Sequence, residues 1–173
     1  MKNFTIIIPI FNESESIFKL IKEIKVEFKK IPEIIIVDDG STDSFINRTN
    51  EIIQKNITIF THSKNLGKCK AMLTGVSNSS NELICVIDGD GQNPPYEVRN
   101  LINYWNELDK LDKKKFLICG NRRKRKDKLT KRLSSKIANL IRKFVLDDDC
   151  NDTACALKVF MRSEYLKISY FRN

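Results

Sequence analysis

The residues of this sequence best suited to chemistry are acidic side chains that directly follow short apolar segments. Asp88 and Asp90 are separated only by Gly89, so both carboxylates can reach one divalent cation. Mg²⁺ and Mn²⁺ prefer oxygen ligands, and Mg²⁺ commonly combines few protein carboxylates with the phosphate oxygens of a substrate. Gly89 and Gly91 would let the backbone approach such a ligand closely. The spacing therefore predicts a site for a metal and a phosphate-bearing substrate.

A second acidic cluster spans residues 38–43. Ser41 and Thr42 are residue types that cap free amides at a helix start, and Asp43 would complement a helix dipole. A turn of this kind leaves two adjacent carboxylates at the end of a buried segment unexplained. A carboxylate there can accept a hydrogen bond from the ring N–H of a nucleobase, so we favour contact with a base or ribose over a purely structural turn.

Three common site types do not fit these patterns. An EF-hand calcium loop opens with a similar D-x-D-G pattern, but its twelfth position, counted from Asp88, is Arg99 instead of the required glutamate. Neither a G-x-x-x-x-G-K-S/T phosphate loop nor a G-x-G-x-x-G dinucleotide fingerprint occurs in the chain. The sequence therefore disfavours a calcium sensor, a P-loop ATPase and a dinucleotide-binding enzyme.

The acidic clusters belong to a chain in which two kinds of apolar segment alternate. Amphipathic helices are predicted at residues 17–28 and 98–108 by apolar residues at three- and four-residue spacing. This alternation predicts one α/β domain, residues 1–173, with a Rossmann-like, mostly parallel sheet and helices on both faces. Ligands of such sheets bind beyond the carboxyl ends of the strands, where both clusters fall. Short β-branched runs predict strands at residues 4–11, 33–37, 57–60, 82–87 and 116–119.

Length and composition favour a cytoplasmic protein. The chain has 173 residues and a mass of 20.1 kDa, and its longest nearly apolar run, residues 4–11, is far shorter than the roughly 20 apolar residues of a membrane-spanning helix. No secretory signal is present. Five cysteines without C-x-x-C spacing, and a single histidine, make no zinc pattern. We expect small buried thiols and no disulfide framework.

The formal net charge of +9 is unevenly distributed along the chain. Residues 110–143 contain 15 basic and 2 acidic side chains, with a peak in the basic block Arg122–Lys128. A localised block predicts an anionic partner: a phosphate-bearing substrate, an anionic membrane surface or a nucleic acid. Residues 129–144 carry an apolar face flanked by basic side chains, which fits either core packing or contact with anionic lipid.

In this order and at these distances, the motifs resemble those of the family 2 glycosyltransferases of GT-A fold. The subgroup they are most similar to is the polyprenyl-phosphate sugar transferases, such as dolichol-phosphate mannose synthase and bacterial undecaprenyl-phosphate glycosyltransferases. The resemblance covers essentially the whole chain. It rests on six motifs: IIIPIFNESESI, IIIVDDGSTD, HSKNLGKCKAMLTG, VIDGDGQNPPY, GNR and NDTACALKVF.

The resemblance implies an inverting, metal-dependent transfer of a sugar from a UDP- or GDP-linked donor to a polyprenyl-phosphate acceptor. The protein would act as a peripheral protein at the cytoplasmic face of the membrane. Because the chain stops where the family usually continues, we expect it to lack the family's C-terminal acceptor-site and membrane segments.

The resemblance also assigns roles on the nucleotide side. Pro9, Phe11 and Glu13 would line the nucleotide site, and Val37 and Asp39 would hold the base. Phe11 stands where the family usually has tyrosine, which removes a hydroxyl but keeps a ring face for stacking.

On the metal side, the resemblance matches residues 88–92 to the family's D-x-D-x-Q pattern. In the family this pattern holds Mg²⁺ or Mn²⁺ and the donor diphosphate. The metal ligands would be Asp88, Asp90 and Gln92, with the backbone of Gly89 beside them. Asp90 would be essential for catalysis.

The remaining assignments concern the phosphates and the acceptor. Arg122 matches an arginine expected near the donor phosphates. Asp152 and Lys158 fall in a stretch near the acceptor, where Ala154 replaces a usual glycine. A lipid monophosphate is already largely dianionic at neutral pH, so Asp152 would organise the acceptor more than act as an essential base.

Two other polar residues are not expected to take part in the chemistry. His62 is a lone histidine after a predicted strand, and we expect it to be incidental and not catalytic. Lys68 precedes a helical stretch at residues 71–76, and a structural role is favoured there over contact with phosphate.

Three other functions stay open on the sequence. A family member of this kind could transfer its sugar to a glycan or protein hydroxyl in cell-envelope polysaccharide synthesis. A nucleotidyltransferase shares an acidic metal site but normally has a glycine-rich loop that is missing here. A nucleic-acid-binding module would use the basic block, but no aromatic residues interleave with that block. The acidic clusters would also repel a polyanion, so we expect no nucleic-acid partner.

Overall fold

The computed structural model describes residues 3–108, 117–120 and 155–168. Over these residues it confirms the predicted α/β fold. The strands are β1 (Thr5–Ile10), β2 (Glu33–Asp38), β3 (Ile57–Thr61), β4 (Leu83–Val86), β5 (Ile118–Cys119) and β6 (Lys158–Met161). The helices are α1 (Ser14–Glu27), the 3-10 helix η1 (Ile46–Glu51), α2 (Lys68–Ser77), α3 (Pro95–Glu107) and α5 (Arg162–Lys167).

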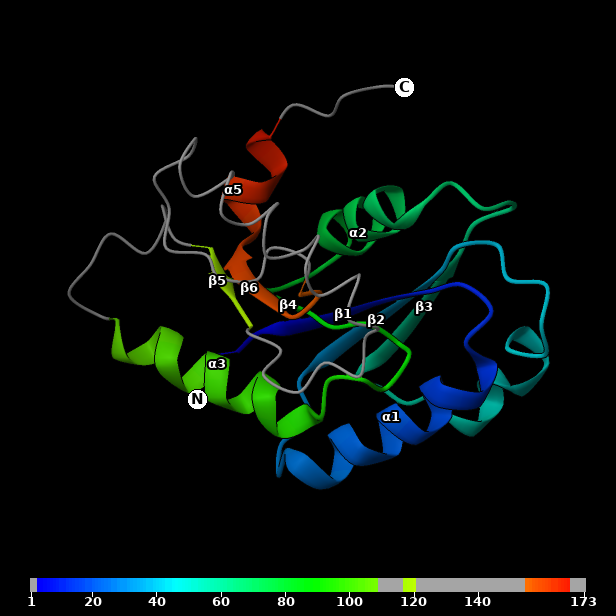
Figure 1. Ribbon diagram of the computed structural model, residues 1–173, viewed down its shortest axis with the longest axis horizontal. Helices are drawn as coiled ribbons and strands as arrows, with labels where there is room; N and C mark the ends of the chain where they lie inside the picture. Colours follow the sequence, from blue (N-terminus) through cyan, green and yellow to red (C-terminus); the bar gives the residue numbers. More distant parts are fainter. Residues whose placement is uncertain (1–2, 109–116, 121–154, 169–173) are drawn as a thin grey trace, which may run out of the picture.

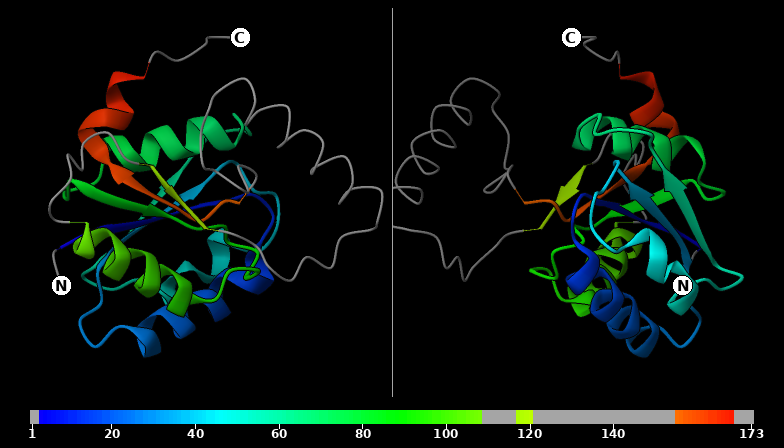
Figure 2. Two further views of the ribbon diagram at one scale, coloured as in Figure 1. Left: turned by 60° about the vertical axis from the view of Figure 1, so that its left-hand side comes forward. Right: turned by 90° about the vertical axis from the view of Figure 1, so that its right-hand side faces the viewer.

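The strands form one six-stranded sheet with the order β3-β2-β1-β4-β6-β5 within the described part of the chain. Helices α1 and α3 cover one face of this sheet, and α2 and α5 cover the other (Figure 1). The two turned views in Figure 2 show the sheet between these helical layers. Strands β1 to β4 run parallel to one another, so their carboxyl ends meet at one edge of the sheet.

Strand β6 was not predicted from the sequence, and neither were η1 and α5. Strand β6 pairs antiparallel with β4, with Val86 opposite Lys158, and β5 in turn pairs antiparallel with β6. The partner strand β4 lies more than 70 residues earlier in the chain than β6, so no local pattern indicates the pairing. Strand β5 is also shorter than the predicted run at residues 116–119.

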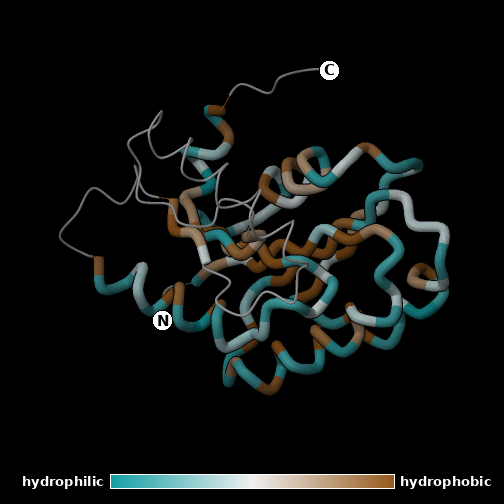
Figure 3. Tube along the Cα trace, in the orientation of Figure 1, coloured by the Kyte–Doolittle hydropathy of each residue, from teal (hydrophilic) through white to brown (hydrophobic). Residues whose placement is uncertain are grey.

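The core explains why the first strand is apolar at almost every position. All six residues of β1 are buried. Ile6 and Ile8 pack into the large cluster that includes the inner faces of α1 and α3, whereas Ile7 packs with Val76 of α2 on the opposite face. The apolar residues concentrate in the central strands, and the outward sides of the helices are mainly hydrophilic (Figure 3). A strand covered on both faces needs a continuous apolar run instead of an alternating one.

The expectation of buried thiols is wrong for Cys69. Helix α2 buries Ala71, Gly75 and Val76 against the sheet, and the side chain of Cys69 lies exposed on another side of the helix. Cys85, in β4, is fully buried, and this burial raises the pKa of its thiol. None of the helices in the described ranges combines the length and the apolar character that crossing a membrane requires.

Candidate active site

Three loops meet at the carboxyl edge of the parallel strands, as the sequence predicts. They follow β1, β2 and β4. The loops after β1 and β2 are joined by direct hydrogen bonds: the amide of Asn12 donates to Ser41 Oγ at 2.9 Å, and the amide of Thr42 donates to Asn12 Oδ1 at 2.8 Å. Asn12 has a φ of 56°, a conformation that asparagine tolerates better than most residues. Hydrogen bonds therefore hold the loop after β1 against the loop after β2.

Asp43 accepts hydrogen bonds from backbone amides at the start of α1 and directly before η1. Its Oδ2 accepts from the amide of Ser14, the first residue of α1, at 2.9 Å, and its Oδ1 accepts from the amide of Phe45 at 3.1 Å. Burial alone would raise the pKa of Asp43, but these amide hydrogen bonds outweigh it and lower the pKa. Asp43 thus holds the start of α1 against the loop after β2.

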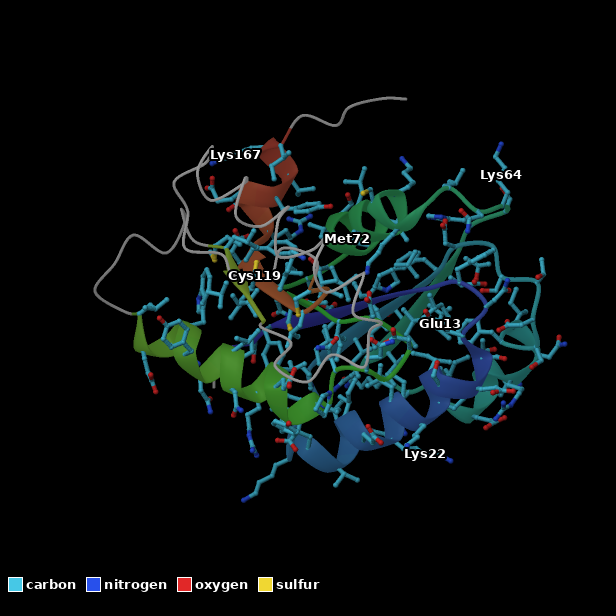
Figure 4. All side chains as sticks on the ribbon, in the orientation of Figure 1. Glu13, Lys22, Lys64, Met72, Cys119 and Lys167 are labelled. Atoms are coloured by element: carbon cyan, nitrogen blue, oxygen red, sulfur yellow. The ribbon has the colours of Figure 1, made fainter. Side chains whose placement is uncertain are left out.

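Glu13 brings a third carboxylate to the predicted metal site. It occupies the N-cap position of α1, and its Oε2 is buried without a hydrogen-bond partner among the described residues. Figure 4 shows Glu13 beside the loop between β4 and α3. Burial, together with the nearby charges of Asp90 and Asp88, raises the pKa of Glu13 from 4.5 to about 7. Glu13, Asp88 and Asp90 therefore form one acidic cluster.

Lys68 supplies positive charge to this cluster. It is the first residue of α2, and its ammonium is hydrogen-bonded to Asp88 Oδ1. Its charge lowers the pKa of Glu13, against the effect of the neighbouring carboxylates. The structural contact of Lys68 is thus an ion pair with Asp88, inside the candidate site.

The side chains at this edge carry oxygen atoms, which are the ligands that a hard cation prefers. Asp90 is exposed, its Oδ1 accepts from the amide of Gln92 at 3.0 Å, and the side chain of Gln92 lies exposed nearby. The buried, unpartnered oxygen of Glu13 is a further hard donor. Within the described ranges, no three acidic, histidine or cysteine side chains are already arranged around a cation position. Phosphate oxygens of a substrate are the usual additional ligands of Mg²⁺.

The predicted nucleotide-lining residues differ in their accessibility. Phe11 directly follows β1 and is 44% exposed, so its ring is accessible from solvent. Pro9 is buried in β1, and Val37 is fully buried and packs with Ala71 of α2. The side chain of Val37 therefore lies inside the core, and the predicted contact of this residue with a base stays a prediction.

Asp39 is buried at the end of β2 and accepts hydrogen bonds from three donors. Its Oδ1 accepts from the amide of Leu66 at 3.0 Å and lies 2.7 Å from His62 Nδ1, and its Oδ2 accepts from the amide of Gly67 at 2.7 Å. His62 is therefore not incidental, contrary to expectation. Its other ring nitrogen lies 2.9 Å from Thr74 Oγ1 on α2. No spacing in the sequence indicated these two contacts, because His62 lies 23 residues from Asp39 and 12 residues from Thr74.

Of the remaining predicted positions, only Lys158 lies within the described residues. Arg122, Asp152 and Ala154, the basic block Arg122–Lys128 and residues 129–144 lie outside the described residues. Lys158 begins β6, where it is partly buried and its ammonium is hydrogen-bonded to the carbonyl of Cys155. Its predicted contact with an acceptor stays a prediction.

Comparison with solved structures defines the class of fold. The chain is similar to glucosyl-3-phosphoglycerate synthase from Mycobacterium tuberculosis in complex with uridine diphosphate, with a TM-score of 0.68 and 19% identity over 94% of this chain and 57% of that chain. It is also similar to a mannosyltransferase from Pyrobaculum calidifontis in complex with GDP-Man and Mn²⁺, with a TM-score of 0.56 and 21% identity over 69% of this chain and 36% of that chain. The protein therefore has the GT-A fold of nucleotide-sugar transferases.

Sequence comparison then gives the family. The family model described as glycosyl transferase family 2 matches residues 5–168, so the chain belongs to that family. It is 30% identical over 169 residues to the undecaprenyl-phosphate 4-deoxy-4-formamido-L-arabinose transferase of Salmonella choleraesuis (strain SC-B67), covering 94% of this chain and 50% of the relative. The chain thus spans about half the length of the curated relative it matches.

Proposed function

We propose that the protein transfers a sugar, with inversion, from a UDP- or GDP-linked donor to a polyprenyl phosphate at the cytoplasmic face of the membrane. The observation that carries the proposal is the convergence of Glu13, Asp88 and Asp90 at the carboxyl edge of a family 2 fold. Support for the acceptor class comes from the similarity to an undecaprenyl-phosphate sugar transferase. Support for the donor and the metal comes from the solved neighbours, which hold UDP or GDP-Man with Mn²⁺ or Mg²⁺.

The chemistry requires stabilisation of the negative charge that develops on the departing nucleotide diphosphate. A bound Mg²⁺ or Mn²⁺ would supply most of that stabilisation. Asp88 and Asp90 would hold it, with Gln92 beside them. Lys68 sits at the N-terminal end of α2, where its ammonium and the helix dipole both favour an anion. Arg122 is proposed to add a second cationic contact to the phosphates.

The acceptor changes what the protein must provide. A sugar hydroxyl has to lose a proton to a positioned base, whereas a phosphate monoester with a second pKa of about 6 is already ionised at neutral pH. The proposed tasks are therefore to attract and orient an anion. The basic block Arg122–Lys128 is proposed to do this, and to bind an anionic membrane surface as well. Asp152 is proposed to organise the acceptor.

Calorimetric titration of UDP and GDP, each with Mn²⁺ and again with EDTA, tests the donor side. We expect one nucleotide to bind with Mn²⁺ and to lose most of its affinity with EDTA. Asp90→Asn should abolish that binding, whereas Glu107→Gln, an exposed change at the far end of α3, should leave it intact. Binding that ignores both EDTA and Asp90→Asn would contradict the metal-dependent proposal.

Product analysis with polyprenyl phosphate and with a sugar-hydroxyl acceptor tests the acceptor side. We expect transfer to the lipid phosphate alone, with measurable turnover in Asp152→Asn and none in Asp90→Asn. Equal and complete loss in both variants would assign Asp152 an essential base. Transfer to the hydroxyl acceptor would place the protein in polysaccharide synthesis instead.

A further inference from the structure

The side chain of Asp39 is held in one orientation by groups from two other segments. His62 contacts it from the end of β3, and the amides of Leu66 and Gly67 contact it from the start of α2. The side chains of Asp39 and His62 are only 5% and 11% exposed. A carboxylate restrained from three directions in this way cannot rotate without breaking buried hydrogen bonds.

The hydrogen-bond roles in this contact follow from the chemistry of the groups. An ionised carboxylate only accepts, so Nδ1 of His62 must carry the proton that Asp39 binds. Nε2, at 2.9 Å from Thr74 Oγ1, then accepts the threonine hydroxyl when the ring is neutral. The ring is therefore fixed at both nitrogens, between the end of β2 and the middle of α2.

These contacts leave one acceptor direction of Asp39 unused. A carboxylate offers about four lone-pair sites. Oδ1 receives two donors, from His62 and Leu66, whereas Oδ2 receives only the amide of Gly67. The remaining lone pair of Oδ2 can accept one donor from a ligand, and its direction depends on how the other three contacts hold the carboxylate.

We propose that His62 is a positioning residue for donor recognition: it orients Asp39 so that Oδ2 accepts the ring N–H of a nucleobase. The proposal rests on the proposed function and specifies part of it. Uracil and guanine carry such a ring N–H, whereas cytosine and adenine present an unprotonated ring nitrogen at the equivalent place. His62 would therefore contribute to the choice of base without touching the nucleotide.

The test compares binding of two matched nucleotides by calorimetry in the presence of Mn²⁺: UDP against CDP, and GDP against ADP. The wild-type protein should prefer the member of one pair that has a ring N–H. In His62→Ala, that preference should fall about tenfold, the equivalent of one well-oriented hydrogen bond. His62→Asn keeps an N–H close to the position of Nδ1, so it should recover most of the preference. Thr74→Val, which removes the contact to Nε2, should cause a smaller loss.

Inorganic pyrophosphate with Mn²⁺ separates positioning from general damage to the site. Because pyrophosphate has no base, its affinity should be the same in wild type and His62→Ala, but it should be lost in Asp90→Asn. An unchanged base preference in a folded His62→Ala would overturn the inference, and so would an equal loss of nucleotide and pyrophosphate binding. If His62→Ala does not fold, the same criterion applies to Thr74→Val, for which a loss of preference is also expected. A wild-type protein that binds neither UDP nor GDP would refute the proposed function itself.

Discussion

The carboxylate of Glu13 lies directly against the backbone of Gly89, so closely that a Cβ added to Gly89 would overlap Glu13 Oε2 and lie 2.5 Å from Ile10 Cγ2. This approach joins the end of β1 to the loop after β4. It also places the Glu13 carboxyl beside Asp88 and Asp90, two of the three residues predicted to bind a metal. The acidic cluster can therefore form because Gly89 has no side chain.

Gly89→Ala should lower the free energy of unfolding by about 1–3 kcal/mol, because the added methyl group overpacks a buried site. It should also weaken Mn²⁺-dependent nucleotide binding, since Glu13 and Ile10 must shift. Urea unfolding and calorimetric titration measure the two effects. Gly91→Ala is the control: a Cβ there meets no atom within 4 Å, and only the φ of 72° opposes it, at a cost of roughly 1–2 kcal/mol. Wild-type stability in Gly89→Ala would contradict the close contact.

Glu13→Gln should change how stability depends on pH. The pKa of Glu13 is raised from 4.5 to about 7, so the folded protein binds more protons than the unfolded chain between these values. Stability therefore falls as the pH rises through this window. The variant lacks this loss and should exceed the wild type by about 1 kcal/mol at about pH 8, a figure reduced for solvent screening of a half-buried group. Below about pH 4.5 the two proteins should be equally stable.

Thermal unfolding between pH 4 and pH 8.5 measures this difference, and Glu107→Gln is a suitable exposed control. The same stability difference between Glu13→Gln and the wild type at every pH would show that the Glu13 carboxyl is not perturbed by burial and by its acidic neighbours.

Lys68→Met should have opposite effects on two ligands. Without the ammonium at Asp88, Mn²⁺ alone should bind about fivefold more tightly, the equivalent of about 1 kcal/mol for a partly exposed ion pair. Nucleotide diphosphate in the presence of Mn²⁺ should bind more weakly, because a cation near the phosphates is lost. Electron paramagnetic resonance of free Mn²⁺ and calorimetry measure the two affinities. Lys70→Met, an exposed change on the same helix, controls for net charge, and parallel changes in both variants would contradict a specific role for Lys68.

Arg162→Met should destabilise the fold without altering ligand binding. The guanidinium of Arg162 donates to the carbonyls of Val76 and Ser77 at 3.0 Å each, at the end of α2. Loss of charged hydrogen bonds to helix-terminal carbonyls should cost about 1–3 kcal/mol. Lys167→Met, which removes only an exposed ion pair to Glu164, should cost less than about 1 kcal/mol. Urea unfolding compares the two variants, and equal losses would show that Arg162 does not cap α2.

The sequence predicted the parallel strands and the larger helices well, because each of these strands is a continuous apolar run and each of these helices has a periodic apolar face. Strand β6 was not predicted, since its pairing with β4 joins it to a distant part of the chain. The same distinction applies to the site. The predicted convergence of residues after β1, β2 and β4 is confirmed, because parallel strands end at a common edge. The contacts that hold Asp39 were missed, because His62 and the amides of Leu66 and Gly67 come from other segments of the chain.

The amino-acid sequence by itself determined the family, the α/β fold and the acidic residues at the strand ends, since those depend on local periodicity and on the order of short motifs. Only the tertiary structure decided which groups meet there. The overlap of Glu13 with Gly89, the ammonium of Lys68 at Asp88 and the contact of His62 with Asp39 each join separate loops. Such contacts depend on how the loops pack at the sheet edge, and no spacing along the chain encodes that packing.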